Sequence, residues 1–165
     1  MRNLIKNVIV GAGLLLIACT GTVSAQSLQD LAGAWKLVSV VSEHQGKTSD
    51  MYGPHPRGIL TIEANGRYVL VVARAHLPKV ASHNRTTATD EENKAIVSGS
   101  IAHFGTLTVD SASKTLDFRI ETSTFPNWDG IDQKRAFTLH DDELRYTVAA
   151  GSAGTSSALV WKRIP

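Results

Sequence analysis

Cysteine is nearly absent from this 165-residue chain, in which Cys19 is the single one, so a disulfide framework within the chain is excluded. An excess of one charge is lacking as well. Arg2 and Lys6 are the only charged residues before Gln26, and the rest of the chain carries fifteen basic and fifteen acidic residues. A domain with no formal net charge and no basic stripe lacks the electrostatic features of nucleic-acid binding, and we expect no DNA or RNA partner.

The motifs of the common catalytic chemistries are also missing. None of the histidines has a partner at the spacing of a helical zinc site, so we expect no metal and no cofactor. There is no Gly-x-Ser-x-Gly elbow, no phosphate-binding glycine loop and no pair of carboxylates in a catalytic motif. The sequence therefore favours a protein that is not an enzyme, although catalysis stays an alternative.

The N-terminus is typical of an exported protein. Arg2 and Lys6 precede an apolar run over residues 7–18, which is shorter than the roughly 20 residues of a membrane span. Small residues at Val23 and Ala25 predict cleavage before Gln26. We expect a signal peptide over residues 1–25 and one periplasmic or secreted domain over residues 26–165. Two alternatives remain: a lipoprotein acylated at Cys19, whose Leu16-Ile17-Ala18-Cys19 resembles a lipobox and which would contact a membrane through the lipid, and a permanent anchor helix.

The rest of the chain consists mainly of short β-rich runs separated by turn residues. Asn65-Gly66 between two such runs is a strong hairpin signal. A capping box of Thr89 and Glu92 predicts one short helix over residues 90–97, and residues 42–57 are expected to form a loop. The predicted strands cover residues 35–41, 58–63, 67–74, 101–109, 115–122, 133–139, 143–149 and 158–163.

Eight or nine strands joined mostly by short turns predict an all-β, antiparallel, up-and-down meander. Alternation along the strands, as in Leu116, Phe118 and Ile120 against their polar neighbours, gives one apolar face. Closure into a barrel removes the exposed edges that an open meander would leave. An eight-stranded barrel has an interior that holds side chains or one small ligand.

Several stretches resemble known barrel families. Gly33-Ala34-Trp35 at the first strand is similar to the Gly-x-Trp signature of the lipocalin and calycin group. That resemblance implies that Trp35 closes one end of the barrel. It also implies that a basic residue near the end of the last strand, Arg163 or alternatively Lys162, packs over the Trp35 ring in a cation–π contact. The bacterial and fungal lipocalin-like domain family is similar to this chain at residues 31–39, 52–60, 102–110, 125–130 with Gln133 and Arg135, and 159–163. This resemblance implies a barrel with a cavity but no particular chemistry.

Candidate ligand contacts come from strand parity and from the loops. Arg74 shares parity with Tyr68 and Leu70 and is expected to point into the barrel toward an anion, or else to pair with an acid at the rim. His103 lies on a strand and either enters the cavity or faces solvent. Trp128 lies in a loop and either covers the mouth or packs the loop. The remaining candidates are Phe104, Arg135 and Tyr146.

The function that the sequence favours is binding of a small hydrophobic or amphipathic molecule in the barrel, with the helix from Asp90 covering or flanking the mouth. One alternative is an isomerase-like or cyclase-like enzyme that uses His103 as its titratable group. Another is a filled barrel that acts only through its surface. The sequence carries no indication of an oligomeric state.

Overall fold

The computed structural model describes residues 26–165, which form one nine-stranded antiparallel sheet with two helices and two short 3-10 turns. The strands are β1 (Gly33–His44), β2 (Lys47–Ser49), β3 (Arg57–Ile62), β4 (Arg67–Ala73), β5 (Ser100–Asp110), β6 (Thr115–Ser123), β7 (Asp132–His140), β8 (Glu143–Val148) and β9 (Ser156–Arg163). The helices are α1 (Leu28–Leu31) and α2 (Asp90–Ser98), and the 3-10 turns are η1 (Arg85–Thr87) and η2 (Pro126–Trp128).

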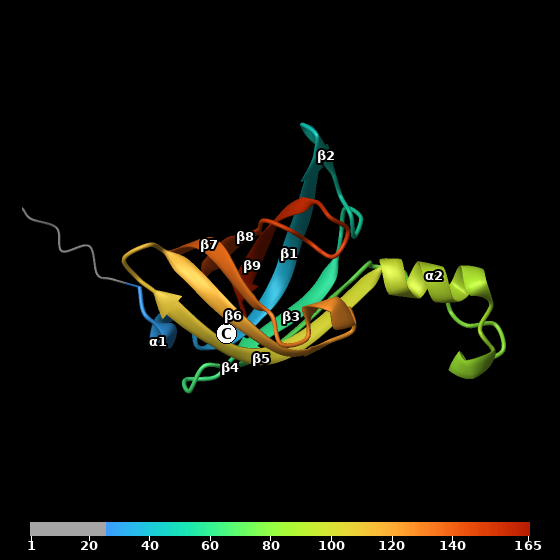
Figure 1. Cartoon of the computed structure of the whole chain (residues 1–165), viewed down its shortest axis with the longest axis horizontal. Coiled ribbons are helices and arrows are strands. Elements are labelled where there is room, and N and C mark those ends of the chain that lie inside the picture. The colour runs from blue at the N-terminus through green and yellow to red at the C-terminus, as the bar shows by residue number, and fades with distance from the viewer. Residues whose placement is uncertain (1–25) are drawn as a thin grey trace, which may run out of the picture.

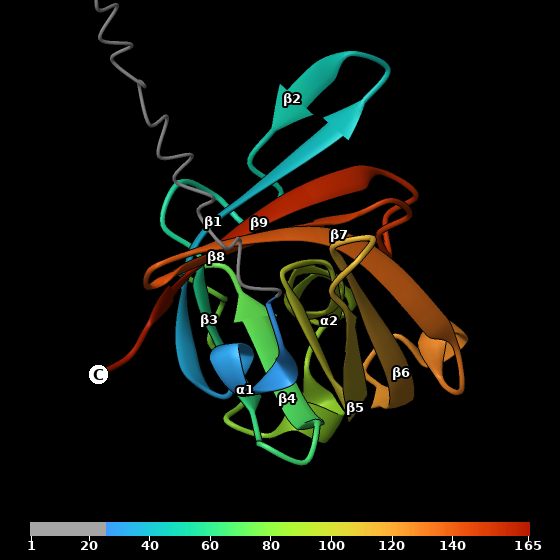
Figure 2. The ribbon, with the colours of Figure 1, turned by 90° about the vertical axis from the view of Figure 1, so that its left-hand side faces the viewer.

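Eight of these strands close into a barrel. From β3 to β9 each strand pairs with the next one in the sequence, and β1 pairs with both β3 and β9 (Figure 2). Residues 33–36 of β1 pair with β3 and residues 35–43 pair with β9, and the register with β9 shifts between Leu37 and Ser39. The predicted all-β, antiparallel, up-and-down barrel is therefore confirmed.

The segment expected to be a loop over residues 42–57 contains a strand. β1 continues to His44, and the chain then turns through Gln45 and Gly46, both at positive φ, into β2 (Figure 1). Two residues of positive φ are typical of a tight hairpin turn. All three residues of β2 are exposed, so the segment has no apolar alternation by which a sequence-based reading would recognise a strand.

The two helices lie at opposite ends of the barrel (Figures 1 and 2). The predicted capping box opens α2, where Glu92 N donates to Thr89 Oγ1 and Thr89 N donates to Glu92 Oε2. None of the α2 residues is buried, and the helix extends away from the barrel. It flanks the mouth and does not cover it, because it offers no apolar face that packs across the opening.

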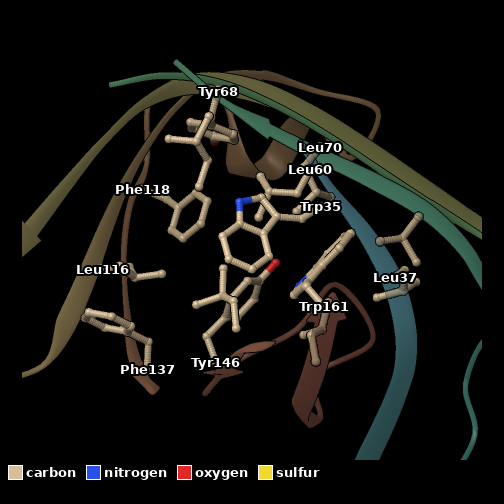
Figure 3. Close-up of a cluster of buried hydrophobic side chains, with 14 of the residues drawn as sticks. Trp35, Leu37, Leu60, Tyr68, Leu70, Leu116, Phe118, Phe137, Tyr146 and Trp161 are labelled. Carbon is tan, nitrogen blue, oxygen red and sulfur yellow. The ribbon is translucent and has the colours of Figure 1, made fainter. Parts of the chain in front are cut away.

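Aromatic side chains fill the half of the barrel next to α1 (Figure 3). Tyr68 packs edge-on against Phe118 with 4.8 Å between ring centroids, and Tyr146 stacks on Trp161. Trp35, Trp161 and Phe118 are completely buried. Among residues 26–165, the space left inside the barrel lies toward the other half.

Candidate functional site

A small cavity lies in the half of the barrel opposite α1. Its wall is mostly apolar, built from Val40 on β1, Leu70 and Val72 on β4, Ile101 on β5 and Leu159 on β9. The cavity encloses about 50 Å³ of free space and opens among the loops before β3, before β7 and between β8 and β9. Three polar or aromatic side chains, His103, Arg135 and Tyr146, complete its inner wall.

Arg135 is a buried cation in this wall. Alternation along β7 turns it inward with Phe137 and Leu139, and only 2% of the residue is exposed. Its guanidinium carbon lies 4.0 Å from the ring centroid of Phe118 and 5.1 Å from that of Tyr146. Its Nη2 atom donates to Gln133 Oε1 at 2.8 Å. Burial lowers the pKa of the guanidinium, yet an arginine remains protonated in proteins.

Tyr68 and His103 form a buried polar pair next to Arg135. The hydroxyl of Tyr68 lies 2.9 Å from Nδ1 of His103, because β4 and β5 pair with Leu70 opposite His103. Burial, together with the positive charge of Arg135, lowers the pKa of His103 to about 3, so the imidazole is neutral at pH 7. Burial raises the pKa of the Tyr68 hydroxyl. The pair therefore presents neutral hydrogen-bonding groups and no additional charge.

Trp128 lines the cavity and also packs its own loop. The indole ring stands edge-on to His103 at 5.8 Å and edge-on to Phe125 at 5.6 Å between centroids. A hydrogen bond of 2.7 Å, donated by Ser123 N to Asp129 Oδ1, holds this loop against the end of β6. Trp128 therefore packs within its loop and lies in the cavity wall.

Two sequence candidates do not reach the cavity. Phe104 is 39% exposed on the outer face of β5, because alternation that turns His103 inward turns its neighbour outward. Arg74 follows the end of β4 at Ala73, at the rim of the barrel, and its side chain is exposed. Its Nε atom donates to the carbonyl of Met51 at 3.3 Å. The expectation that Arg74 points into the barrel is wrong, and it holds a rim loop in place.

The structure adds residues that the sequence did not single out. Met51 and Tyr52 line the mouth, Gln133 binds the buried guanidinium, and Ser42 and Ser157 share a buried hydrogen bond of 2.9 Å. Parity alone places Tyr68 inside the barrel, but its bond to His103 depends on the register of β4 and β5. That register is set across the long connection through α2, which carries no turn signal from which the pairing could be read.

The end of the barrel next to α1 is sealed by Arg163 and Trp35. The guanidinium carbon of Arg163 lies 4.1 Å from the Trp35 ring centroid. Its Nη1 and Nη2 atoms donate to the carbonyls of Ala32 and Asp30 at 2.9 and 2.6 Å, and Trp35 Nε1 donates to Leu31 O at 2.9 Å. α1 is thereby fixed across this end, opposite the cavity mouth.

Within residues 26–165 no three His, Cys, Asp or Glu side chains converge in a way that suits a metal ion. In the same part of the chain no helix has both the length and the apolar character of a membrane span.

A closed eight-stranded antiparallel barrel, sealed at one end by a tryptophan–arginine contact and open at the other to an internal cavity, defines a lipocalin-like protein. The family model described as "Lipocalin-like domain" matches residues 32–164, and the chain belongs to this family. A comparison with curated proteins found no match.

Proposed function

We propose that this protein binds a small amphipathic molecule inside its barrel. The observation that supports the proposal is a cavity whose outer wall is apolar and whose inner wall carries two buried polar side chains, His103 and Arg135. Apolar burial supplies affinity at about 25 cal/mol per Å², and a few fixed polar groups orient the ligand. This division of roles is the usual one in small-molecule pockets.

The size of the cavity restricts the ligand. Pockets for drug-sized molecules enclose about 300–1,000 Å³, well above the roughly 50 Å³ found inside this barrel. A ligand therefore places only a small group in the inner cavity, and its remainder passes between the partly buried side chains of Met51 and Trp128 at the mouth. A bulky ligand enclosed completely by the barrel is not compatible with this geometry.

The enzymatic alternative receives less support. His103 faces the cavity, as an acid–base role would require, but its pKa of about 3 makes it a weak proton acceptor at neutral pH. The filled-barrel alternative fits the half of the barrel next to α1, where the side chains of Figure 3 pack together. It does not fit the other half, which holds the cavity.

Export to the periplasm or the medium is part of the proposal. It rests on the basic residues, apolar run and small residues at the cleavage position within residues 1–25, which lie outside the described residues. Acylation at Cys19 remains the alternative form of export.

Native mass spectrometry of the protein purified from its own envelope tests binding. We expect a bound small molecule that is retained by Val69→Phe and lost in Val148→Phe. Val148 lines the cavity near its mouth, whereas Val69 is 52% exposed on the outer face of β4. An unliganded mass for the wild type, persisting after incubation with envelope metabolites and lipids, would contradict the proposal.

A further inference from the structure

Arg135 makes fewer contacts than a buried arginine requires. None of the ion pairs among residues 26–165 involves it, and its Nε atom has no hydrogen-bond partner among the protein atoms. Arginines that do form ion pairs lie partly exposed on the barrel surface. Arg67 pairs with Glu121, and Arg119 pairs with Asp132. Arg135 is thus a buried, charged side chain that has no acidic partner among residues 26–165.

The surroundings of Arg135 compensate its charge only in part. The rings of Phe118 and Tyr146 offer cation–π contacts, and Gln133 accepts one hydrogen bond. The guanidinium carries five N–H donors in a planar fork, so most of them remain for another acceptor. Tyr146 Oη, also in the cavity wall, makes no well-aligned hydrogen bond within the protein, although it lies close to the side chains of Arg135 and Trp161.

We infer that the bound molecule carries a single carboxylate, which accepts hydrogen bonds from the guanidinium of Arg135 at the inner end of the cavity. The inference rests on the proposed function and specifies its ligand class. A planar guanidinium and a carboxylate match in geometry and form charge-assisted hydrogen bonds. The carboxylate fits the small inner space, and the apolar remainder of the molecule lies toward Val148 and Trp128.

The number of charges in the wall selects a monoanion. Arg135 is the only Lys or Arg side chain in the wall, and His103 is neutral at pH 7. A carboxylate balances this one charge, whereas a phosphate dianion would leave an uncompensated negative charge in a low-dielectric site. An uncharged ligand such as an alcohol would leave the arginine without a counter-ion.

The test compares octanoate with 1-octanol, which share an alkyl chain of similar length and differ in charge. Binding is followed by calorimetry and by the protection of Trp128 fluorescence from acrylamide, since Trp35 and Trp161 are completely buried. At pH 7 we expect the wild type to bind octanoate at least about tenfold more tightly than 1-octanol. Equal affinity for the two would overturn the inference and leave the proposed function standing. Binding of neither would overturn both.

Variants assign the preference to one side chain. Arg135→Gln is expected to lose the preference for octanoate, Arg135→Lys to keep part of it, and the matched surface control Arg119→Gln to keep all of it. A folded Arg135→Gln protein that still prefers octanoate would overturn the assignment. A measurement on the wild type covers the case in which Arg135→Gln does not fold: the ¹³C-carboxyl signal of bound octanoate should titrate at lower pH than that of free octanoate. An unchanged or raised midpoint would place the carboxylate away from Arg135.

Discussion

The hydroxyl of Tyr68 and the Nδ1 atom of His103 lie 2.9 Å apart inside the barrel, and neither side chain is more than 4% exposed. The pair is flanked by the ring of Phe118, by Trp128 and by the cationic Arg135. Protonation of His103 would therefore bury a second positive charge close to the first. We therefore expect the stability of the barrel to depend on pH through this histidine.

His103→Gln should make stability less sensitive to acid. The pKa of His103 is about 3 in the folded protein and 6.5 when unfolded, so the unfolded state binds more protons between these values. The wild type should lose stability as pH falls through this window, by up to about 1.4 kcal/mol per pH unit from this residue alone. Urea unfolding at several pH values should show a smaller slope for His103→Gln. The exposed control His140→Gln should keep the wild-type slope, and equal slopes for all three proteins would refute this explanation.

Arg163→Ala should destabilise the barrel by about 2 kcal/mol or more. The change removes the contact with the Trp35 ring and leaves the carbonyls of Ala32 and Asp30 without their donor. Lys162→Ala, at the exposed neighbouring position, should change the free energy of unfolding by less than about 0.5 kcal/mol. Similar values for the two variants in urea denaturation would show that the contact with Trp35 contributes little.

Gly105→Ala should be among the most damaging small substitutions. A Cβ atom at this position would collide with the carbonyl oxygen of Arg119, where the register of β5 and β6 shifts, so backbone has to move. We expect a loss of about 2 kcal/mol or more by thermal or urea unfolding. Gly154→Ala is the matched control, because its Cβ would meet open space and only its positive φ, costing about 1 kcal/mol, opposes the change. A smaller loss for Gly105→Ala than for Gly154→Ala would contradict the clash.

Arg135→Met should leave the unliganded protein as stable as the wild type or make it more stable, by up to about 4 kcal/mol. Methionine keeps much of the side-chain length and removes a buried charge that has no acidic partner. Chemical denaturation without ligand measures the change. A decrease of several kcal/mol in the free energy of unfolding would indicate instead that the guanidinium stabilises the core through its contacts with Phe118 and Tyr146.

The alternation of apolar residues predicted most of the architecture. It is strong along β6, β7 and β8, where one face is buried and the other is wet, and these strands begin and end close to the expected positions. β2 was not predicted from the sequence because the hairpin that contains it leaves the barrel, so that none of the β2 residues is buried. The seal between Trp35 and Arg163 was expected from a family resemblance, whereas the end of the barrel at which it lies came from the structure.

The candidate site was less accessible to sequence reasoning. The positions of Arg135 and Tyr146 in the cavity wall could be predicted because apolar residues alternate clearly along their strands. The two failures are Arg74, which lies one residue beyond the end of β4, and Phe104, which lies on the outward face of β5. The contact of His103 with Tyr68 depends on a register set by tertiary pairing. Whether an inward arginine finds an acid depends on all surrounding strands, which no single stretch of sequence contains.

The hydrogen bonds of Gln26 bear on how the protein would meet a membrane. Gln26 donates to the carbonyl of Leu139 and accepts from Ser111, so the described chain begins at the sealed end of the barrel. Seven peptide units separate Cys19 from Gln26 and span at most about 25 Å. If Cys19 is lipidated, the bilayer would face the Trp35–Arg163 seal, and vesicle-bound protein should take up octanoate as fast as the soluble domain. A protein held in this orientation would exchange a bound ligand with the aqueous phase and would not extract it from the lipid beneath.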